Sequence, residues 1–169
     1  NVPLQGLVLA PTLELTAQIA RVFNSLEEGS AAALQRDTAE LPRSAPVVVG
    51  PPAMAMRLLG GGGQSNAGRT PRLDKDDMRE LKFVVLDEAD ALLMPLGKYA
   101  TQKEKTRRAN NPKEAATLLQ LLCAQRKHQL QILAASATVG RPLRRELAAV
   151  CDRTLEVIRE PEVAKAVPI

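Results

Sequence analysis

Four short runs of apolar residues constrain the fold of this chain most strongly. They are residues 7–10, 46–50, 83–86 and 130–135. Runs of this length that end at turn-forming or acidic residues are typical of strands buried on both faces of a sheet. Helical spacing of apolar residues follows or separates them, at 13–28, 54–59, 74–81, 91–96, 114–124 and 141–150. This alternation predicts an α/β fold, a parallel sheet with helices on both faces.

Weaker patterns fill the remaining segments of the chain. Residues 31–41 resemble a weak helix, and the alternation over residues 154–158 predicts a last strand. The Gly-rich residues 60–72 predict a flexible loop, and residues 97–112 an exposed, charged insertion. The length of 169 residues fits one domain, which we assign to residues 1–160, and residues 161–169 are expected to be a tail or linker.

Composition excludes few classes of function. A net charge of +4 fits a phosphate-rich partner without requiring one. Aromatic residues make up only 2%, which argues against a fold that stacks RNA bases on exposed rings. No apolar run approaches the length of a membrane span, so no membrane partner is expected. Because no secretory signal is seen, Cys123 and Cys151 are interpreted as reduced thiols, although the start at Asn1 indicates a piece of a longer polypeptide.

Three carboxylates follow the apolar run 83–86, namely Asp87, Glu88 and Asp90. Ligands of open α/β sheets bind at the carboxyl ends of the strands, where these side chains are expected. A magnesium ion on nucleotide phosphates would offset their mutual repulsion. In this interpretation Asp87 holds Mg²⁺ through water, Glu88 orients and deprotonates the attacking water, and Asp90 couples the site to a neighbouring loop. The alternative is an acidic strand end that only caps the next helix.

Small hydroxyl residues follow two other apolar runs. Ser136 and Thr138 come after residues 130–135, where their hydroxyls can hydrogen-bond a carboxylate on the adjacent strand, although such a sequence alone is an ordinary turn. Pro11 and Thr12 come after residues 7–10 and open a helix. A helix N-terminus with a hydroxyl suits a phosphate, and a plain N-cap is the alternative.

Taken together and in this order, these segments resemble motifs Ia, II and III of the DEAD-box RNA helicases. Residues 87–90 match motif II and residues 136–138 match motif III in full. Motif Ia usually reads Pro-Thr-Arg-Glu-Leu-Ala-x-Gln, and here it runs from Pro11 to Gln18 with Leu13 in place of the Arg. The resemblance implies part of the first RecA-like domain, with ATP and Mg²⁺ as cofactors and RNA bound by Pro11, Thr12 and Gln18.

The departures from these motifs are equally specific. Motif Ib normally reads Thr-Pro-Gly-Arg, but the chain has Pro-Pro-Ala-Met at residues 51–54. With Leu13 this removes two cations, so weaker RNA binding at the usual groove is expected. Motif I and the Q motif are not found, and residues 63–70 have the spacing of a phosphate loop but the wrong order and context. We therefore expect the chain by itself not to hydrolyse ATP.

The insertion at 97–112 is strongly basic. Its candidates for RNA contact are Lys103, Lys105, Arg107 and Arg108, beside the single acid Glu104. Two interpretations are equally open, namely a solvated loop and an arm that docks on structured RNA.

Two functions compete. The first is a DEAD-box helicase that remodels RNA or RNA–protein complexes with ATP. The second is a helicase-derived scaffold or assembly factor in a ribonucleoprotein particle, such as a mitochondrial ribosome precursor. The expected partners are RNA, with ribosomal RNA as one candidate, assembly proteins, and a second RecA-like lobe of the same polypeptide. An intracellular location is expected, with the mitochondrion as first guess and the nucleolus and cytoplasm as alternatives.

Overall fold

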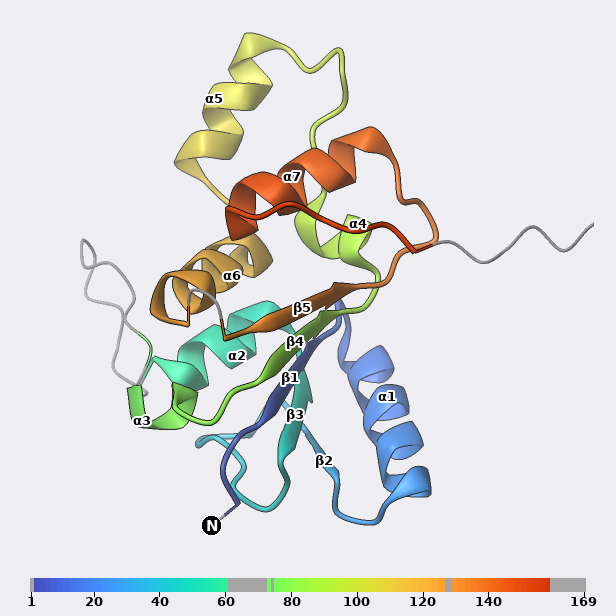
Figure 1. Ribbon diagram of the computed structural model, residues 1–169, viewed down its shortest axis with the longest axis vertical. Coiled ribbons are helices and arrows are strands. Elements are labelled where there is room, and N and C mark those ends of the chain that lie inside the picture. The colour runs from blue at the N-terminus through green and yellow to red at the C-terminus, as the bar shows by residue number, and fades with distance from the viewer. Residues whose placement is uncertain (1, 61–72, 74, 127–128, 159–169) are drawn as a thin grey trace, which may run out of the picture.

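A five-stranded sheet forms the centre of the molecule, whose computed structural model describes residues 2–60, 73, 75–126 and 129–158 (Figure 1). The strands are β1 (Gly6–Leu9), β2 (Ala31–Ala33), β3 (Val47–Gly50), β4 (Phe83–Leu86) and β5 (Gln131–Ala134). Their order is β2-β3-β1-β4-β5, and every neighbouring pair is parallel. The prediction of a parallel α/β sheet is therefore confirmed.

The register of the sheet places the carboxyl ends of four strands, β1, β3, β4 and β5, side by side. Leu9 lies opposite Gly50 on one side and Leu86 on the other, and Leu86 lies opposite Ala134. The residues that follow β1, β4 and β5 consequently emerge at one edge of the sheet.

Helices cover both faces of the sheet, as expected (Figure 1). One face carries α1 (Leu13–Leu26), whose Ala20 packs with Val8 and Val49 in a small core. The other face carries α2 (Pro52–Leu59), α6 (Glu114–Gln125) and α7 (Arg141–Cys151), which bury the larger core. Successive strand residues point to opposite faces, so each apolar strand serves both cores.

Three shorter helices connect these elements. They are α3 (Lys75–Met78), α4 (Ala89–Leu93) and α5 (Gln102–Asn110). Helix α5 lies at the top of the view in Figure 1, beyond α7, and none of its residues is buried. Helix α4 directly follows the acidic strand end and is buried at Ala89, Leu92 and Leu93.

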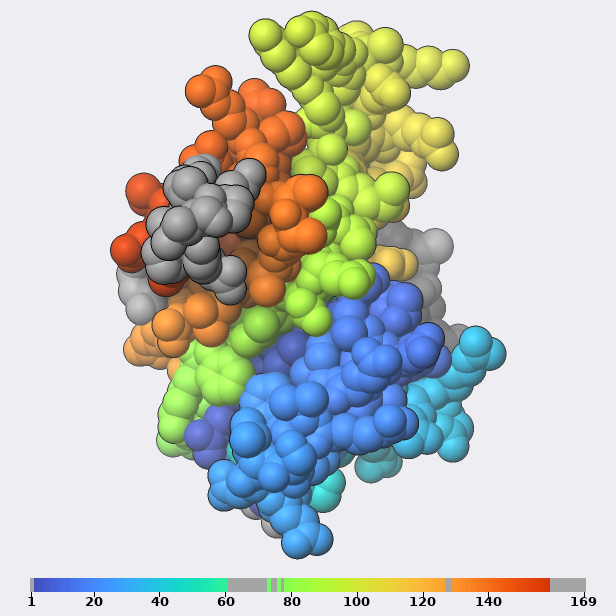
Figure 2. All heavy atoms as spheres, turned by 90° about the vertical axis from the view of Figure 1, so that its right-hand side faces the viewer, coloured from blue at the N-terminus to red at the C-terminus, as the bar shows by residue number. Residues whose placement is uncertain are grey.

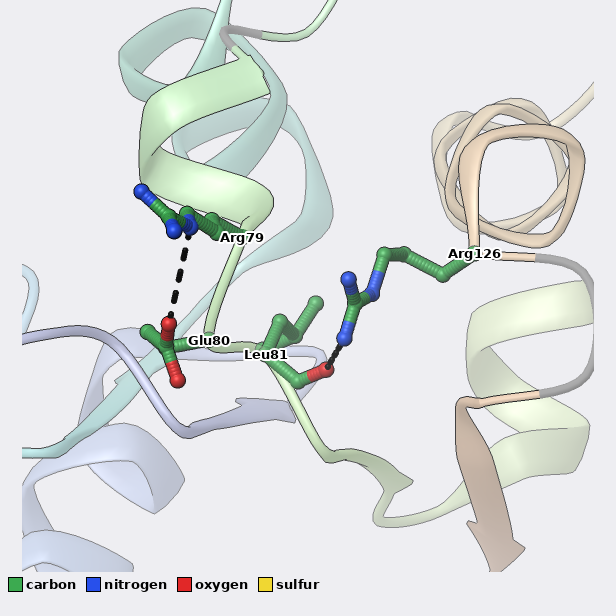
Figure 3. Close-up of polar contacts among 4 residues, drawn as sticks. All are labelled: Arg79, Glu80, Leu81 and Arg126. Carbon is green, nitrogen blue, oxygen red and sulfur yellow. Dashed lines mark hydrogen bonds and ion pairs between the residues drawn. The ribbon is translucent and has the colours of Figure 1, made fainter.

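An arginine fixes the end of α6 to the segment that enters β4 (Figure 3). The Arg126 guanidinium donates through Nη2 to the Leu81 carbonyl oxygen at 3.3 Å, in a partly buried position. The nearby pair of Arg79 and Glu80 is different, because its 3.8 Å contact is exposed at both side chains. Charged hydrogen bonds away from water are worth more than exposed ion pairs, so the Arg126 contact contributes more to stability here than the pair of Arg79 and Glu80.

The predicted weak helix at residues 31–41 is wrong. The chain instead forms the edge strand β2 and then an irregular segment. Alanine favours helices, but here Ala31 to Ala33 pair with β3, and Leu34 is buried against Gly50. Gly29, at φ +75°, reverses the chain after α1, which brings the alanines to the sheet edge.

The predicted last strand at residues 154–158 is also wrong. Its alternation is present, since Leu155 and Val157 are half-buried and their neighbours are exposed. No strand of the described residues pairs with it, however, and the segment remains extended coil beside α7. The predicted loop at 60–72 and the predicted tail at 161–169 lie outside the described residues, except for Gly60.

Candidate functional site

The acidic residues after β4 are held by backbone bonds to the strands on either side. The Asp87 amide donates to the Leu9 carbonyl oxygen at 2.9 Å. Two residues later, the Ala89 amide donates to the Ala135 carbonyl oxygen at 2.9 Å. The turn that carries Asp87 and Glu88 is thus fixed to the ends of both β1 and β5, at the edge where sheets of this class bind ligands.

Glu88 adopts a backbone conformation that is rare for its residue type. Its φ and ψ are both 51°, in the left-handed region, and its side chain is exposed. The Asp87 carboxylate accepts a hydrogen bond from the Glu88 amide at 3.1 Å, which supports this turn. Left-handed residues outside glycine cost on the order of 1 kcal/mol and cluster at functional sites. Within the described residues, no hydrogen bond or ion pair occupies the Glu88 carboxylate.

Asp90 and the hydroxyl residues after β5 are in direct contact. The Thr138 hydroxyl donates to Asp90 Oδ2 at 2.7 Å. The Ser136 hydroxyl accepts from the Thr138 amide at 3.1 Å, which shapes the turn between them. Hydrogen bonds from Thr138 and then from Ser136 lower the pKa of Asp90, because they stabilise the charged form. The contact between the two strand ends that the sequence predicted is therefore present.

The donor set suits a magnesium ion that is bound mainly by a nucleotide. Among the described residues no group of three or more acidic, Cys or His side chains could hold a metal by itself. Magnesium keeps several waters and usually takes only one or two protein carboxylates, with the remaining ligands coming from phosphates. Asp87 is half-buried and uses one carboxylate oxygen for the Glu88 amide. Its other oxygen fits the single, water-mediated contact proposed from the sequence.

Thr12 lies at the same edge, after β1. Its hydroxyl accepts from the Leu15 amide at 3.2 Å, so Thr12 is the N-cap of α1. Pro11 is half-buried, and Gln18 is exposed nearly two turns further along the helix. The structure thus places these three candidates along the first turns of one helix, while their contact with RNA stays a prediction.

The basic insertion contains a helix that the sequence interpretation did not assign. Helix α5 begins at a capping box, in which the Thr101 hydroxyl accepts from the Glu104 amide and Glu104 accepts from the Thr101 amide. The sequence signal was present as Thr-x-x-Glu before a charged run. Lys103, Lys105 and Arg107 are exposed on this helix.

Arg108 differs from the other three cations of this helix. It is half-buried, and its guanidinium donates to the carbonyl oxygens of Leu93 and Met94 at the end of α4. Arg108 therefore fixes α5 to the helix that carries Asp90, and it is a poorer candidate for RNA contact than its neighbours.

Comparison with protein families gives one match that spans most of the chain. A profile described as "DEAD/DEAH box helicase" matches residues 2–145. A search of curated proteins found no match.

Solved structures resemble the fold across nearly the whole chain. A variant of S. cerevisiae Dbp5, bound to a Gle1 variant and IP6, has a TM-score of 0.59 at 20% identity, covering 93% of this chain and 35% of its own. Mss116p bound to single-stranded RNA and AMP-PNP has a TM-score of 0.55 at 17% identity, covering 88% and 28%. The chain spans about a third of the length of these relatives, and their likeness identifies its sheet as RecA-like. In the described part of the chain, no helix is both long and apolar enough to cross a bilayer.

Proposed function

This chain belongs to the DEAD/DEAH box helicase family, and on that premise we propose that it forms part of the first lobe of an ATP-dependent RNA-remodelling protein. The observation that carries the proposal is the hydrogen bond between Asp90 and Thr138, beside a Glu88 carboxylate that forms no hydrogen bond or ion pair with the described residues. If these acids only capped the next helix, Asp90 would not need a bond to Thr138 after β5. Nor would the neighbouring Glu88 carboxylate need to stay exposed.

Each carboxylate has a distinct task in this proposal. ATP with Mg²⁺, when bound, supplies the phosphoryl group that water attacks. Asp87 would hold the metal through water. Glu88 orients the attacking water and accepts its proton, for which an exposed and unoccupied carboxylate is suited. Asp90 is a positioning residue, because it ties the turn that carries Asp87 and Glu88 to the loop of Ser136 and Thr138.

RNA would contact the same edge of the sheet from β1 and α1. Backbone amides at the start of a helix attract phosphate groups, and Thr12 already organises those of α1. The chain has Leu13 and residues 51–54 where the family has cations. We therefore propose that part of the affinity for RNA comes from cations elsewhere, for which α5 is the candidate.

The test is ATP hydrolysis by the full-length protein that contains this chain, measured with and without single-stranded RNA. Turnover that rises with RNA supports the remodelling function. The absence of hydrolysis, together with retained binding to ribonucleoprotein particles, would favour the second candidate, a helicase-derived scaffold or assembly factor. The substitutions at residue 13 and residues 51–54 motivate that alternative, since they weaken RNA contact while leaving Asp87, Glu88 and Asp90 in place.

We further propose that the exposed cations of α5 bind phosphate groups of RNA. Changing Lys103, Lys105 and Arg107 to Gln removes three exposed positive charges from one helix. Each lost phosphate contact lowers the salt slope by about 0.7 on single strands, so the slope of log K against log salt should fall by roughly 2. Binding of single-stranded RNA at several salt concentrations measures this slope.

Equal charge removal elsewhere is the control for α5. Arg36, Arg79 and Lys82 are exposed on other segments, and their joint change to Gln should leave the slope almost unchanged. Equal falls for both triple variants would show that only net charge matters, and this role of α5 would then be rejected.

A further inference from the structure

Two cysteines that are far apart in the sequence lie together where α6 and α7 end. Cys123 is in the last turn of α6 and Cys151 is the last residue of α7, and these two helices pack side by side (Figure 1). The two residues are 8% and 3% exposed. Both line one cavity of about 550 Å³, together with Gln120, Ala124 and Arg153.

The environment gives the two thiols unequal acidity. Hydrogen-bonding interaction with the neighbouring Cys151 side chain lowers the pKa of Cys123 to about 7, against the opposing effect of burial. The positive charge of Arg153 acts in the same direction. The same hydrogen bond, with burial, raises the pKa of Cys151. Cys123 is therefore the more acidic thiol of the pair and the one that we expect to react first, with Cys151 beside it.

We propose that Cys123 and Cys151 form a redox site, in which a small peroxide converts the pair to a disulfide between α6 and α7. The Cys123 thiolate attacks one oxygen of hydrogen peroxide, and the O–O bond breaks to give a sulfenic acid and, after protonation, water. The Cys151 sulfur then attacks the Cys123 sulfur, and the S–O bond breaks to release a second water. In sum, two thiols are oxidised, one peroxide is reduced, and two waters form.

Peroxide is the oxidant that suits this geometry. Reaction rates of thiols depend on thiolate content and on access. The thiols are nearly covered, so a bulky disulfide reagent reaches them poorly, whereas the cavity beside them admits a molecule as small as peroxide. A nearby resolving thiol is the usual arrangement of cysteines that oxidise reversibly.

Disulfide formation would alter the packing of α6 and α7, the helices that support α4 and the candidate site. Helix α7 begins just after Thr138, and α4 packs against both α6 and α7. Joining the far ends of α6 and α7 would restrict the unfolded chain and make this packing more rigid. The oxidised form should melt roughly 5–10 °C above the reduced form.

The experiment uses the folded full-length protein, which is treated with hydrogen peroxide, then unfolded in urea with excess N-ethylmaleimide and digested without reductant. Mass spectrometry should find the Cys123 peptide joined to the Cys151 peptide, with a mass two hydrogens below their sum, and dithiothreitol should reverse the linkage. Peptides that stay unlinked, with both cysteines carrying the maleimide, would overturn the proposal. So would linkage of either cysteine to a different cysteine of the protein.

A second measurement does not depend on oxidation or on any variant. Arsenite is small enough to enter the cavity and bridges two thiols only when they are adjacent, so one equivalent should protect both cysteines from maleimide that is added after unfolding in urea. Failure of this protection in the native protein would show that the thiols are not paired. In Cys151→Ala, checked for folding by circular dichroism, the pH at which Cys123 alkylates half-maximally should rise, because the hydrogen bond that stabilises its thiolate is lost. An unchanged profile would contradict the assigned roles.

Discussion

Replacing Glu88 by Gln should lower kcat for ATP hydrolysis by the full-length protein about 10²–10⁴-fold, which is the usual contribution of a general base. Gln keeps the size and the hydrogen-bonding capacity of the side chain but cannot accept the proton of the attacking water. Because Glu88 is exposed and holds no other residue of the described chain, the fold should not change. The KM for ATP should therefore stay nearly constant, and steady-state kinetics measures both quantities.

The matched control lies at the other end of the same strand. Glu80 precedes β4, is exposed and forms an ion pair with Arg79 at 3.8 Å. Glu80→Gln makes the same chemical change about one strand length from the candidate site and should leave kcat within twofold. If Glu88→Gln retains full turnover, Glu88 is not the base. In that case the proposed role of this turn would have to be abandoned, although the fold would stand.

The site is the part of the structure that the sequence predicted best. Thr138 and Asp90 are 48 positions apart, yet each follows an apolar strand, and parallel strands bring such positions to one edge. The contact at 2.7 Å was expected because hydroxyl residues at one strand end can hydrogen-bond a carboxylate on the adjacent strand, and the resemblance to motifs II and III pointed to these two segments. Space-filling atoms show the corresponding surface, where the α4 segment lies between α1 and α7 (Figure 2).

The wrong predictions have a common physical cause. Whether a segment forms a strand depends on a partner that local sequence does not reveal. Ala31 to Ala33 became a strand because β3 offered an open edge, while residues 154–158 alternate correctly but meet no strand in the described chain. The pairing of Cys123 with Cys151 was missed for the same reason, since it depends on how α6 packs against α7.

Replacing Leu93 by Ala should lower the free energy of unfolding by about 2–5 kcal/mol, the usual cost of a cavity at a buried leucine. Leu93 is fully buried in the larger core, and α4 has only five residues with which to hold its position. Urea denaturation measures the change, and Leu26→Ala is the control. Leu26 is 82% exposed, so the same deletion there should cost less than about 0.5 kcal/mol.

Leu93→Ala should also affect the candidate site, because α4 carries Asp90. Leu93 packs α4 against the larger core, and the Thr138 hydroxyl holds the Asp90 carboxylate on the same helix. In Leu93→Ala, α4 is held less firmly, so the rate of ATP hydrolysis should begin to fall at a lower temperature than in the parent protein. In Leu26→Ala this temperature should not change. A loss of stability below 1 kcal/mol in Leu93→Ala would mean that packing does not position α4. Its position would then rest on polar contacts, chiefly those of Arg108 and Thr138.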